Sequence, residues 1–115
     1  MKRNFFIPKG KKLLINEKGR KRYIDIENIT HITCEGHIST IHTINNKSIS
    51  VYKLLKEFEK ELQEYKFVRT HHNSICCLFN VSEYKKINKK HILVLKNNQK
   101  VEISARKLPI VLKLL

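Results

Sequence analysis

Short stretches of alternating polar and apolar residues fill the first half of the chain. A period of two is the pattern of half-buried β-strands. The connecting segments contain glycine or asparagine, which tolerate the left-handed backbone of tight turns. Gly19, Gly36 and the pair Asn45-Asn46 mark three such turns. The sequence therefore predicts successive β-hairpins, with strands in residues 12–16, 22–26, 27–34, 37–44 and 47–51.

The hydrophobic period changes at Ser50. From there the apolar positions recur at helical spacing, as residues 51, 54, 55, 58, 62 and 65. This pattern predicts one main α-helix over about residues 51–65, with Ser50 as its N-cap. The other face of that helix mixes glutamates with lysines, so we expect it to be solvated and to face away from a polyanion.

Residues 67–81, FVRTHHNSICCLFNV, combine two kinds of sequence. An apolar run at residues 75–79 is typical of a buried strand. Directly before it lie basic, ring-bearing and hydrogen-bonding side chains, from Arg69 to Ser74. Because such side chains are costly to bury, we interpret this cluster as a surface that contacts a ligand.

The last third of the chain returns to the hairpin pattern. Strands are predicted in residues 91–96 and 100–104, with asparagine-containing turns at residues 88–90 and 97–98. The apolar tail that follows is expected to end as a short C-terminal helix. Many short strands with tight turns favour a mostly β domain of sandwich-like or barrel-like type.

Net charge indicates what this β domain binds. The 115 residues include 24 Lys and Arg against 10 Asp and Glu, a net charge of +14. It is +8 in residues 1–22, −2 in residues 23–66 and +8 in residues 67–115. This distribution favours a polyanion: nucleic acid first, an anionic membrane surface second, with a merely solubilising charge as the alternative. Residues 1–11 form a basic N-terminal arm that either touches phosphates or is a frayed terminus.

The placement of the cysteines disfavours metal binding and catalysis. Cys76 and Cys77 are adjacent in a predicted strand and point to opposite faces, so they do not converge on one ion. An apolar run also keeps a thiol protonated and unreactive. We expect no metal, no cofactor and no enzyme activity. The sequence has no signal peptide and no apolar run of ~18–20 residues, so we expect a cytoplasmic protein with no membrane insertion.

Residues 67–81 resemble the LytTR family of bacterial DNA-binding domains. That family has an aromatic residue, an arginine, a histidine, polar residues and an apolar run in this order. Here Phe67, Arg69, His71 and His72 precede the apolar run. Segments on both sides also resemble the family in the right order, namely YIDIENITHITCEGHISTIHT, SISVYKLLKEFEKEL and VEISARKL.

The resemblance covers about residues 12–112 and implies a fold. That fold is mostly β, with small antiparallel sheets in an elongated, sandwich-like arrangement, one main α-helix and a short C-terminal helix. The arm then occupies residues 1–11 and the LytTR-like DNA-binding domain residues 12–115. The chain is too short for the receiver domain that precedes many LytTR domains, so we expect a stand-alone regulator or part of a longer protein.

The resemblance also implies that loop residues enter successive major grooves of DNA. The implied base contacts are His37, His72, Asn73 and Arg106. The implied phosphate contacts are Arg69, Lys85, Lys86, Lys89, Lys90 and Lys107. Alternatives stay open for most of these residues. Arg69 is a structural anchor, and the lysines at positions 85, 86, 89 and 90 are simply solvated. Among the base contacts, His37 is a surface turn residue, His72 and Asn73 cap the start of the strand, and Arg106 pairs with Glu102.

We therefore expect a sequence-specific, double-stranded-DNA-binding transcriptional regulator. Its affinity would come largely from Lys and Arg contacts with phosphates. A homodimer on repeated half-sites and a regulatory partner protein are further expectations. The alternatives are an RNA-binding β module, shown by a preference for single-stranded RNA, and a protein-interaction module, shown by a salt-insensitive protein partner.

Overall fold

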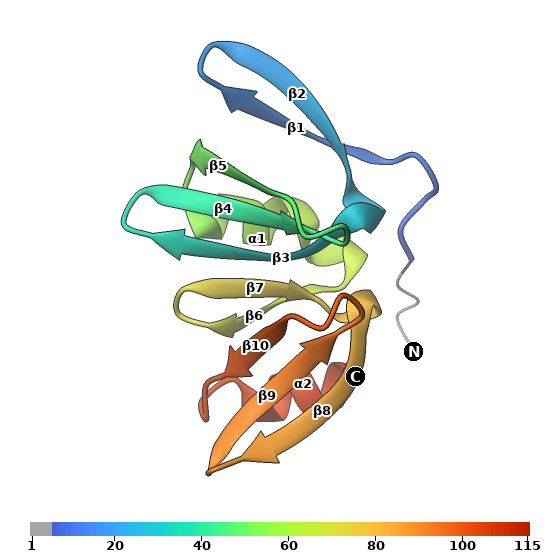
Figure 1. Ribbon diagram of the computed structural model, residues 1–115, viewed down its shortest axis with the longest axis vertical. Helices are drawn as coiled ribbons and strands as arrows, with labels where there is room; N and C mark the ends of the chain where they lie inside the picture. Colours follow the sequence, from blue (N-terminus) through green and yellow to red (C-terminus); the bar gives the residue numbers. More distant parts are fainter. Residues whose placement is uncertain (1–5) are drawn as a thin grey trace.

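Hairpin follows hairpin along the chain, and the strands collect into three antiparallel sheets (Figure 1). The computed structural model describes residues 6–115. The central sheet has five strands in the order β5-β4-β3-β7-β6. Its strands are β3 (Ile29–Glu35), β4 (Ile38–Thr43), β5 (Ser48–Tyr52), β6 (Phe67–His71) and β7 (Ser74–Cys77).

Two smaller sheets lie at the two ends of the central sheet (Figure 1). One is the hairpin of β1 (Lys12–Glu17) and β2 (Arg20–Asp25). The other has the order β10-β9-β8, from β8 (Val81–Ile87), β9 (Lys90–Leu95) and β10 (Lys100–Ile103). The molecule measures 42 × 34 × 24 Å. The expected mostly β fold of small antiparallel sheets is confirmed.

Two short 3₁₀ turns carry the chain from one sheet to the next. Ile26–Asn28 leads from β2 into β3, and Leu78–Asn80 leads from β7 into β8. The side-chain amide of Asn80 is buried and donates a hydrogen bond to the carbonyl of Ile29 at 2.9 Å. The second 3₁₀ turn is therefore bonded to the beginning of β3.

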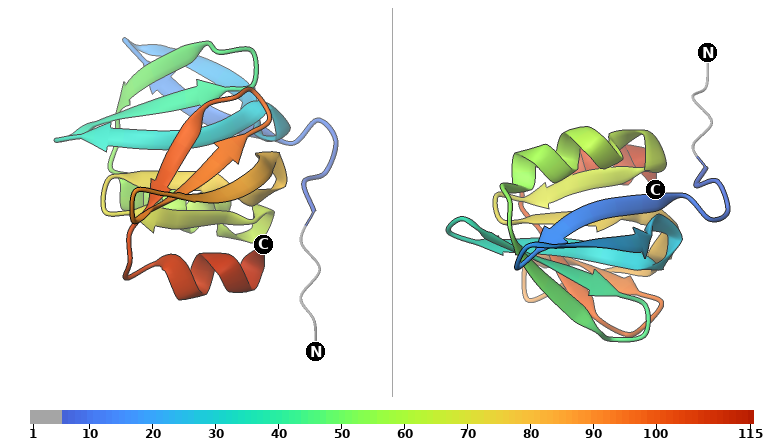
Figure 2. Two further views of the ribbon diagram at one scale, coloured as in Figure 1. Left: turned by 60° about the horizontal axis from the view of Figure 1, so that its bottom comes forward. Right: turned by 90° about the horizontal axis from the view of Figure 1, so that it is seen from above.

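Helices α1 (Leu55–Leu62) and α2 (Leu108–Leu114) lie on the same side of the molecule (Figure 2). Each closes its own hydrophobic core. From α1, Phe58 packs among the inward side chains of the central sheet. From α2, Val111 packs with the inward side chains of β9 and β10. Full burial of such a side chain contributes about 1.5–3 kcal/mol, so both helices are fixed by packing. No helix within residues 6–115 is long and apolar enough to cross a membrane.

Cys76 and Cys77 pack into different cores. Their adjacency in a strand predicts this, because neighbouring side chains point to opposite faces of a sheet. Cys77 belongs to the core beneath α1, and Cys76 belongs to the core beneath α2. Burial raises the pKa of the Cys77 thiol to about 11 and raises the pKa of Cys76 further still. Both side chains are therefore protonated at neutral pH and pack as small apolar groups.

The main helix, predicted over about residues 51–65, begins later and ends earlier than its periodicity predicts. It ends at Leu62, because a 3₁₀ turn at Gln63–Tyr65 follows. Val51 and Tyr52 continue β5, and α1 starts only at Leu55. Ser50 is not the N-cap, because its hydroxyl lies 3.0 Å from Thr40 Oγ1 across the sheet. The carboxylate of Glu57 instead accepts the Leu54 N–H at 3.0 Å, which satisfies a donor at the helix start. Val51 fits both the strand and the helix period, so the pattern could not locate the change.

Two other predicted boundaries are adjusted by the structure. The apolar run at residues 75–79 is a strand only as far as Cys77, where the 3₁₀ turn begins. Of the expected N-terminal arm, residues 1–5 lie outside the described residues. Ile7 packs against the core beneath α1, so this part of the arm is docked. Its role as a phosphate contact stays a prediction.

Candidate nucleic-acid interface

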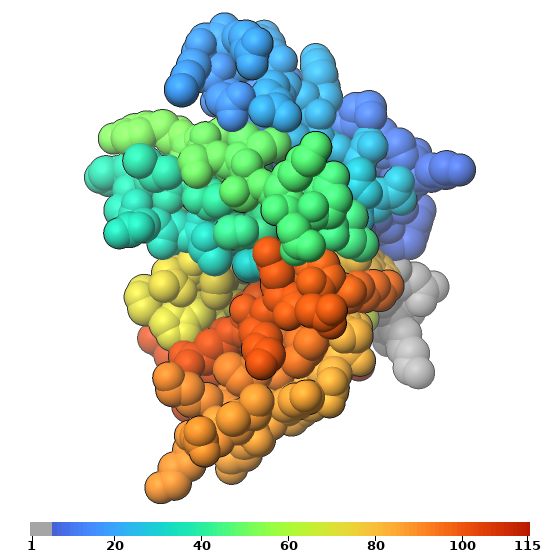
Figure 3. All heavy atoms as spheres, viewed as in Figure 1, coloured from blue at the N-terminus to red at the C-terminus, as the bar shows by residue number. Residues whose placement is uncertain are grey.

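Five connections lie along one long edge of the molecule, at the left in Figure 1. In Figure 3 the β1–β2, β3–β4, β6–β7 and β8–β9 turns protrude along this outline. We call this edge the turn edge. It consists of the β1–β2 turn (residues 18–19), the β3–β4 turn (36–37), the β6–β7 turn (72–73), the β8–β9 turn (88–89) and the segment between β10 and α2 (104–107).

His37 is exposed at the tip of the β3–β4 turn. The turn has only two central residues, and Gly36 takes the first with φ of 62°. A turn of type II′ requires this conformation, which glycine adopts without steric cost. The His37 ring lies against the exposed ring of Tyr52, with centroids 5.8 Å apart. The tight turn and the contact with Tyr52 therefore restrict the position of the exposed His37 imidazole.

Arg69 holds the β6–β7 turn from within. Its Nε donates to the carbonyl of His71 at 3.0 Å, and one terminal nitrogen donates to the carbonyl of His72. The other terminal nitrogen lies 3.2 Å from Glu59 Oε1 on α1. The guanidinium thus acts as an anchor for the turn, the alternative that the sequence left open. His72 and Asn73 at the tip remain exposed.

The segment that carries Arg106 is bonded directly to the neighbouring strand. The Ser104 N–H donates to the carbonyl of Thr70 at 2.9 Å. The carbonyl of Ser104 then accepts the N–H groups of Lys107 and Leu108, each at 3.0 Å, as α2 begins. The turn is therefore well fixed, while the Arg106 side chain is exposed.

The β8–β9 hairpin supplies the lysines that the resemblance implies as phosphate contacts. Its turn places Asn88 and Lys89 at φ of 49° and 68°, as in a type I′ turn. Lys90 lies 3.6 Å from Glu102. Lys85 lies 3.7 Å from Glu83, whereas Lys86 and Lys89 have no ion pair within residues 6–115. Exposed pairs of this length are weak, so all four ammonium groups are accessible.

Behind the β6–β7 turn, a hollow of about 260 Å³ lies between β3, β7 and β10. Partly buried His71 lines it, with Nε2 3.6 Å from Glu102 and a buried Nδ1 that has no partner within residues 6–115. His31 also lines it and stacks on His42, with centroids 4.1 Å apart. Burial and, to a smaller extent, the neighbouring His42 together lower the pKa of His31 to about 4. His31 is therefore neutral in the folded protein.

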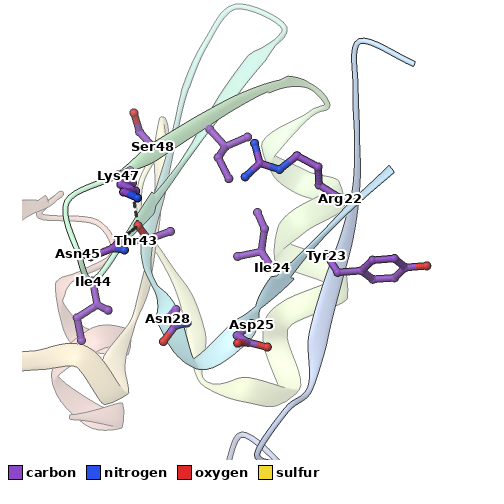
Figure 4. Close-up of a pocket in the computed structure, with 11 residues that line it drawn as sticks. Arg22, Tyr23, Ile24, Asp25, Asn28, Thr43, Ile44, Asn45, Lys47 and Ser48 are labelled. Atoms are coloured by element: carbon purple, nitrogen blue, oxygen red, sulfur yellow. Dashed lines mark hydrogen bonds between the residues drawn. The ribbon is translucent and has the colours of Figure 1, made fainter. Parts of the chain in front are cut away.

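A hollow of about 750 Å³ lies away from the turn edge, between β2 and the β4–β5 turn (Figure 4). Two of its three charged side chains are engaged by neighbours: Arg22 pairs with Glu17 at 3.1 Å, and Asp25 with Lys12 at 2.6 Å, whereas Lys47 has no ion pair within residues 6–115. Tyr23 points away from the hollow (Figure 4). No group of three or more metal-ligating side chains is found within residues 6–115. This hollow therefore offers few free groups to a ligand.

The fold brings the four expected base-contact residues to the same edge, although 69 positions separate the first from the last. These residues are His37, His72, Asn73 and Arg106. The structure adds Lys18 and Arg20, in and beside the β1–β2 turn, and Tyr52, which sequence analysis did not select. The sequence indicates the β1–β2 turn through Gly19 and its charged neighbours, but it does not indicate that this turn lies on the turn edge.

Comparison with known proteins gives a family match and a structural similarity. A family model described as LytTr DNA-binding domain matches residues 19–115. The fold is similar to the LytTr DNA-binding domain of a protein described as a methyl-accepting/DNA response regulator from Bacillus cereus. That similarity has a TM-score of 0.76 at 14% sequence identity, and it covers 90% of this chain and 94% of the other. A search of curated proteins gives no match.

Proposed function

The chain belongs to the LytTR family of DNA-binding domains, and we propose that it recognises double-stranded DNA through the turn edge. Membership of this family assigns the chain to DNA binding and transcription regulation. One observation carries this proposal. The exposed side chains of His37, His72, Asn73 and Arg106 have no hydrogen bond to other side chains or to the backbone within residues 6–115, while backbone contacts fix the turns that present them. Donors and acceptors held this way are available to base edges.

The dimensions of the edge suit duplex DNA. The long axis of the molecule is 42 Å, which corresponds to about 12 base pairs at ~3.4 Å per base pair. This exceeds one helical turn of ~10.5 base pairs. Turns spaced along this edge can therefore reach two successive major grooves on one face of the duplex. This length supports the insertion of loop residues into each of the two grooves.

We assign different roles to different turns. His37, His72, Asn73 and Arg106 contact base edges, where an imidazole, an amide and a guanidinium distinguish donor and acceptor patterns. The phosphate contacts come from Lys85, Lys86, Lys89, Lys90 and Lys107. Arg69 is mainly an anchor; three of its five N–H groups are engaged, which leaves two for an adjacent phosphate. The role is one of binding, without catalysis.

Selection from a random duplex-DNA library at two salt concentrations tests this proposal. We expect enrichment of a motif, with an apparent affinity that falls steeply as salt rises. Arg106→Ala should blur the motif at one position and lower affinity by about 1–3 kcal/mol. Lys47→Ala, in the β4–β5 turn away from the turn edge, should leave the motif unchanged. A repeat within the motif would support a homodimer on half-sites.

Three other outcomes would contradict the proposal. Salt-sensitive binding with no enriched motif would leave only nonspecific DNA binding. Preferential binding of single-stranded RNA in competition with duplex DNA would favour the RNA-binding alternative. Absence of nucleic-acid binding, together with a salt-insensitive protein partner, would favour a protein-interaction module.

A further inference from the structure

The β1–β2 hairpin continues the turn edge beyond the β3–β4 turn (Figure 1). Its tip and the start of β4 line a hollow of about 550 Å³, together with the end of β5. The lining includes Lys18 and Arg20 from the hairpin, Ile38 next to His37, and Tyr52. This hollow is therefore the immediate neighbour of a proposed base contact.

The hollow has an excess of positive charge. Lys18 and Arg20 are exposed and have no ion pair within residues 6–115. The one carboxylate in the lining, Glu17, is engaged by Arg22 at 3.1 Å. The two cations are therefore not neutralised by the protein, and the chemistry of the hollow suits an anion.

The turn between these cations has a defined backbone. Glu17 and Arg20 lie opposite each other in the strand register of the hairpin, so the turn has two central residues. Lys18 has φ of 49° and Gly19 has φ of 79°, as in a type I′ turn. A tight turn restricts where its neighbouring side chains can reach, so both cations stay near the hollow.

Tyr52 supplies a third group. It is 80% exposed, the largest exposure among the large hydrophobic side chains of residues 6–115. Its ring lies against His37, and its phenol can donate a hydrogen bond. An aromatic side chain left in water beside two cations suggests contact with a ligand.

We propose that Lys18, Arg20 and Tyr52 form a phosphate-binding notch that holds the DNA backbone beside the groove entered by His37. The inference rests on the proposed function and extends it by a site that neither the resemblance nor the family match assigns. The family match begins at Gly19, so Lys18 and all of β1 lie outside it. With the lysines of the β8–β9 hairpin at the other end of the molecule, the notch places basic contacts on both sides of the central base-reading turns.

Titration of the selected duplex with wild type and with Lys18→Asn/Arg20→Gln, over a range of salt concentrations, tests the notch. Asparagine tolerates the left-handed backbone at residue 18, so the turn is retained. Loss of two phosphate contacts should lower the slope of log K against log salt by about 1.8 and weaken binding at ~0.1 M salt at least tenfold. The enriched base motif should not change.

The matched control is Lys47→Gln/Lys96→Gln, which removes the same charge from the edge opposite the turn edge. It should keep the wild-type slope and affinity. Equal losses in both double variants would overturn the notch and indicate only a general effect of charge. If the hairpin variant has a lowered melting temperature, Arg20→Gln alone, at an exposed strand position, gives the same test at half the expected change in slope.

Two further measurements separate the notch from the proposed function. Hydroxyl-radical footprinting should show that the hairpin variant loses protection at only one flank of the site, and an unchanged footprint would overturn the notch. Tyr52→Phe should weaken binding without changing the salt slope, because it removes a hydroxyl and no charge; wild-type affinity would exclude the phenol from the notch. Failure of wild type to bind duplex DNA would overturn the proposed function itself.

Discussion

On the edge opposite the turn edge, several uncharged polar side chains form hydrogen bonds within the protein. The Thr43 hydroxyl donates to Asn45 Oδ1 at 2.6 Å, and the Asn97 amide donates to the carbonyl of Thr43 at 3.3 Å. Asn80 bonds to β3 in the same way. On the turn edge, the exposed side chains of His72 and Asn73 make no such bonds within residues 6–115. Residue type alone therefore does not identify a binding surface; the partner of each polar group does.

Engaged and exposed side chains can be compared for the same type of amino acid. Histidine, asparagine and arginine each occur both bonded within the protein and exposed on the turn edge. His31, Asn80 and Arg69 are engaged inside the protein, and His72, Asn73 and Arg106 are exposed on the turn edge. Substitution of an engaged member should lower the free energy of unfolding, whereas substitution of an exposed member should lower DNA affinity.

Histidine should give the largest difference in stability. The folded-state pKa of His31 is about 4, below its ordinary value of 6.5, so the unfolded chain binds more protons between these values. The free energy of unfolding should fall as pH falls from 6.5 to 4, by about 3 kcal/mol from this residue. Urea denaturation at several pH values measures the effect, and His31→Gln should remove this part of the acid sensitivity.

His72→Gln is the matched control for that prediction. Its ring is exposed in the folded protein, so the variant should keep the wild-type free energy of unfolding at neutral pH. A His31→Gln variant that loses stability with acid as steeply as wild type would contradict the assignment.

Asparagine should give the next largest difference. Asn80→Ala leaves the buried carbonyl of Ile29 without its donor, which should cost about 1–3 kcal/mol of unfolding free energy. Asn73→Ala should change stability by less than ~0.5 kcal/mol but lower the affinity for the selected duplex by about 1–3 kcal/mol. Urea denaturation and duplex titration of both variants measure the two effects. Equal stability losses would break the comparison.

Arginine should show a smaller effect on stability. Arg69→Lys keeps the charge but loses the forked geometry that bonds two carbonyls of the β6–β7 turn. Because the pair with Glu59 is partly exposed, we expect a loss of about 1 kcal/mol by thermal denaturation. Arg106→Ala should have the melting temperature of wild type. A melting temperature of Arg69→Lys as high as that of wild type would exclude the anchor role.

Lysine should show the smallest effect, and only on binding. Lys86→Gln should lower the salt slope by about 1 and leave the base motif unchanged. Lys96→Gln should leave both unchanged, because this residue lies away from the turn edge (Figure 1). The measurement is a salt titration of duplex binding. A change of motif in Lys86→Gln would mean that the hairpin reads bases and not only phosphates.

Much of the fold could be predicted from local pattern. Alternation and turn residues located the hairpins, because a strand with one buried face must alternate and a tight turn needs a left-handed residue. The helix start was wrong by several residues because Val51 satisfies both periods and its strand pairing with Ser39 decides between them. The strand at residues 74–77 was expected to continue to Phe79, but the 3₁₀ turn at Leu78–Asn80 ends it.

The candidate site was predicted less completely. The resemblance supplied His37, His72, Asn73 and Arg106 as base contacts, a role that stays a proposal. It left open whether Arg69 contacts phosphate or anchors its turn, and the contact with Glu59 on α1 supports the anchor. Nothing in the sequence indicated that Lys18 and Arg20 lie beside Tyr52, because the β1–β2 hairpin packs near β5 only in the folded protein.

The sequence by itself determined the hairpins, the positive charge at both ends of the chain, and the separation of Cys76 from Cys77. These depend on spacing along the chain, which is local. Only the tertiary structure decided which polar side chains are engaged and which are exposed to a ligand. Those outcomes depend on hydrogen bonds between distant residues, such as Asn80 with Ile29, 51 positions apart, and Asn97 with Thr43, 54 apart. Such partners are set by the packing of sheets, which no local pattern encodes.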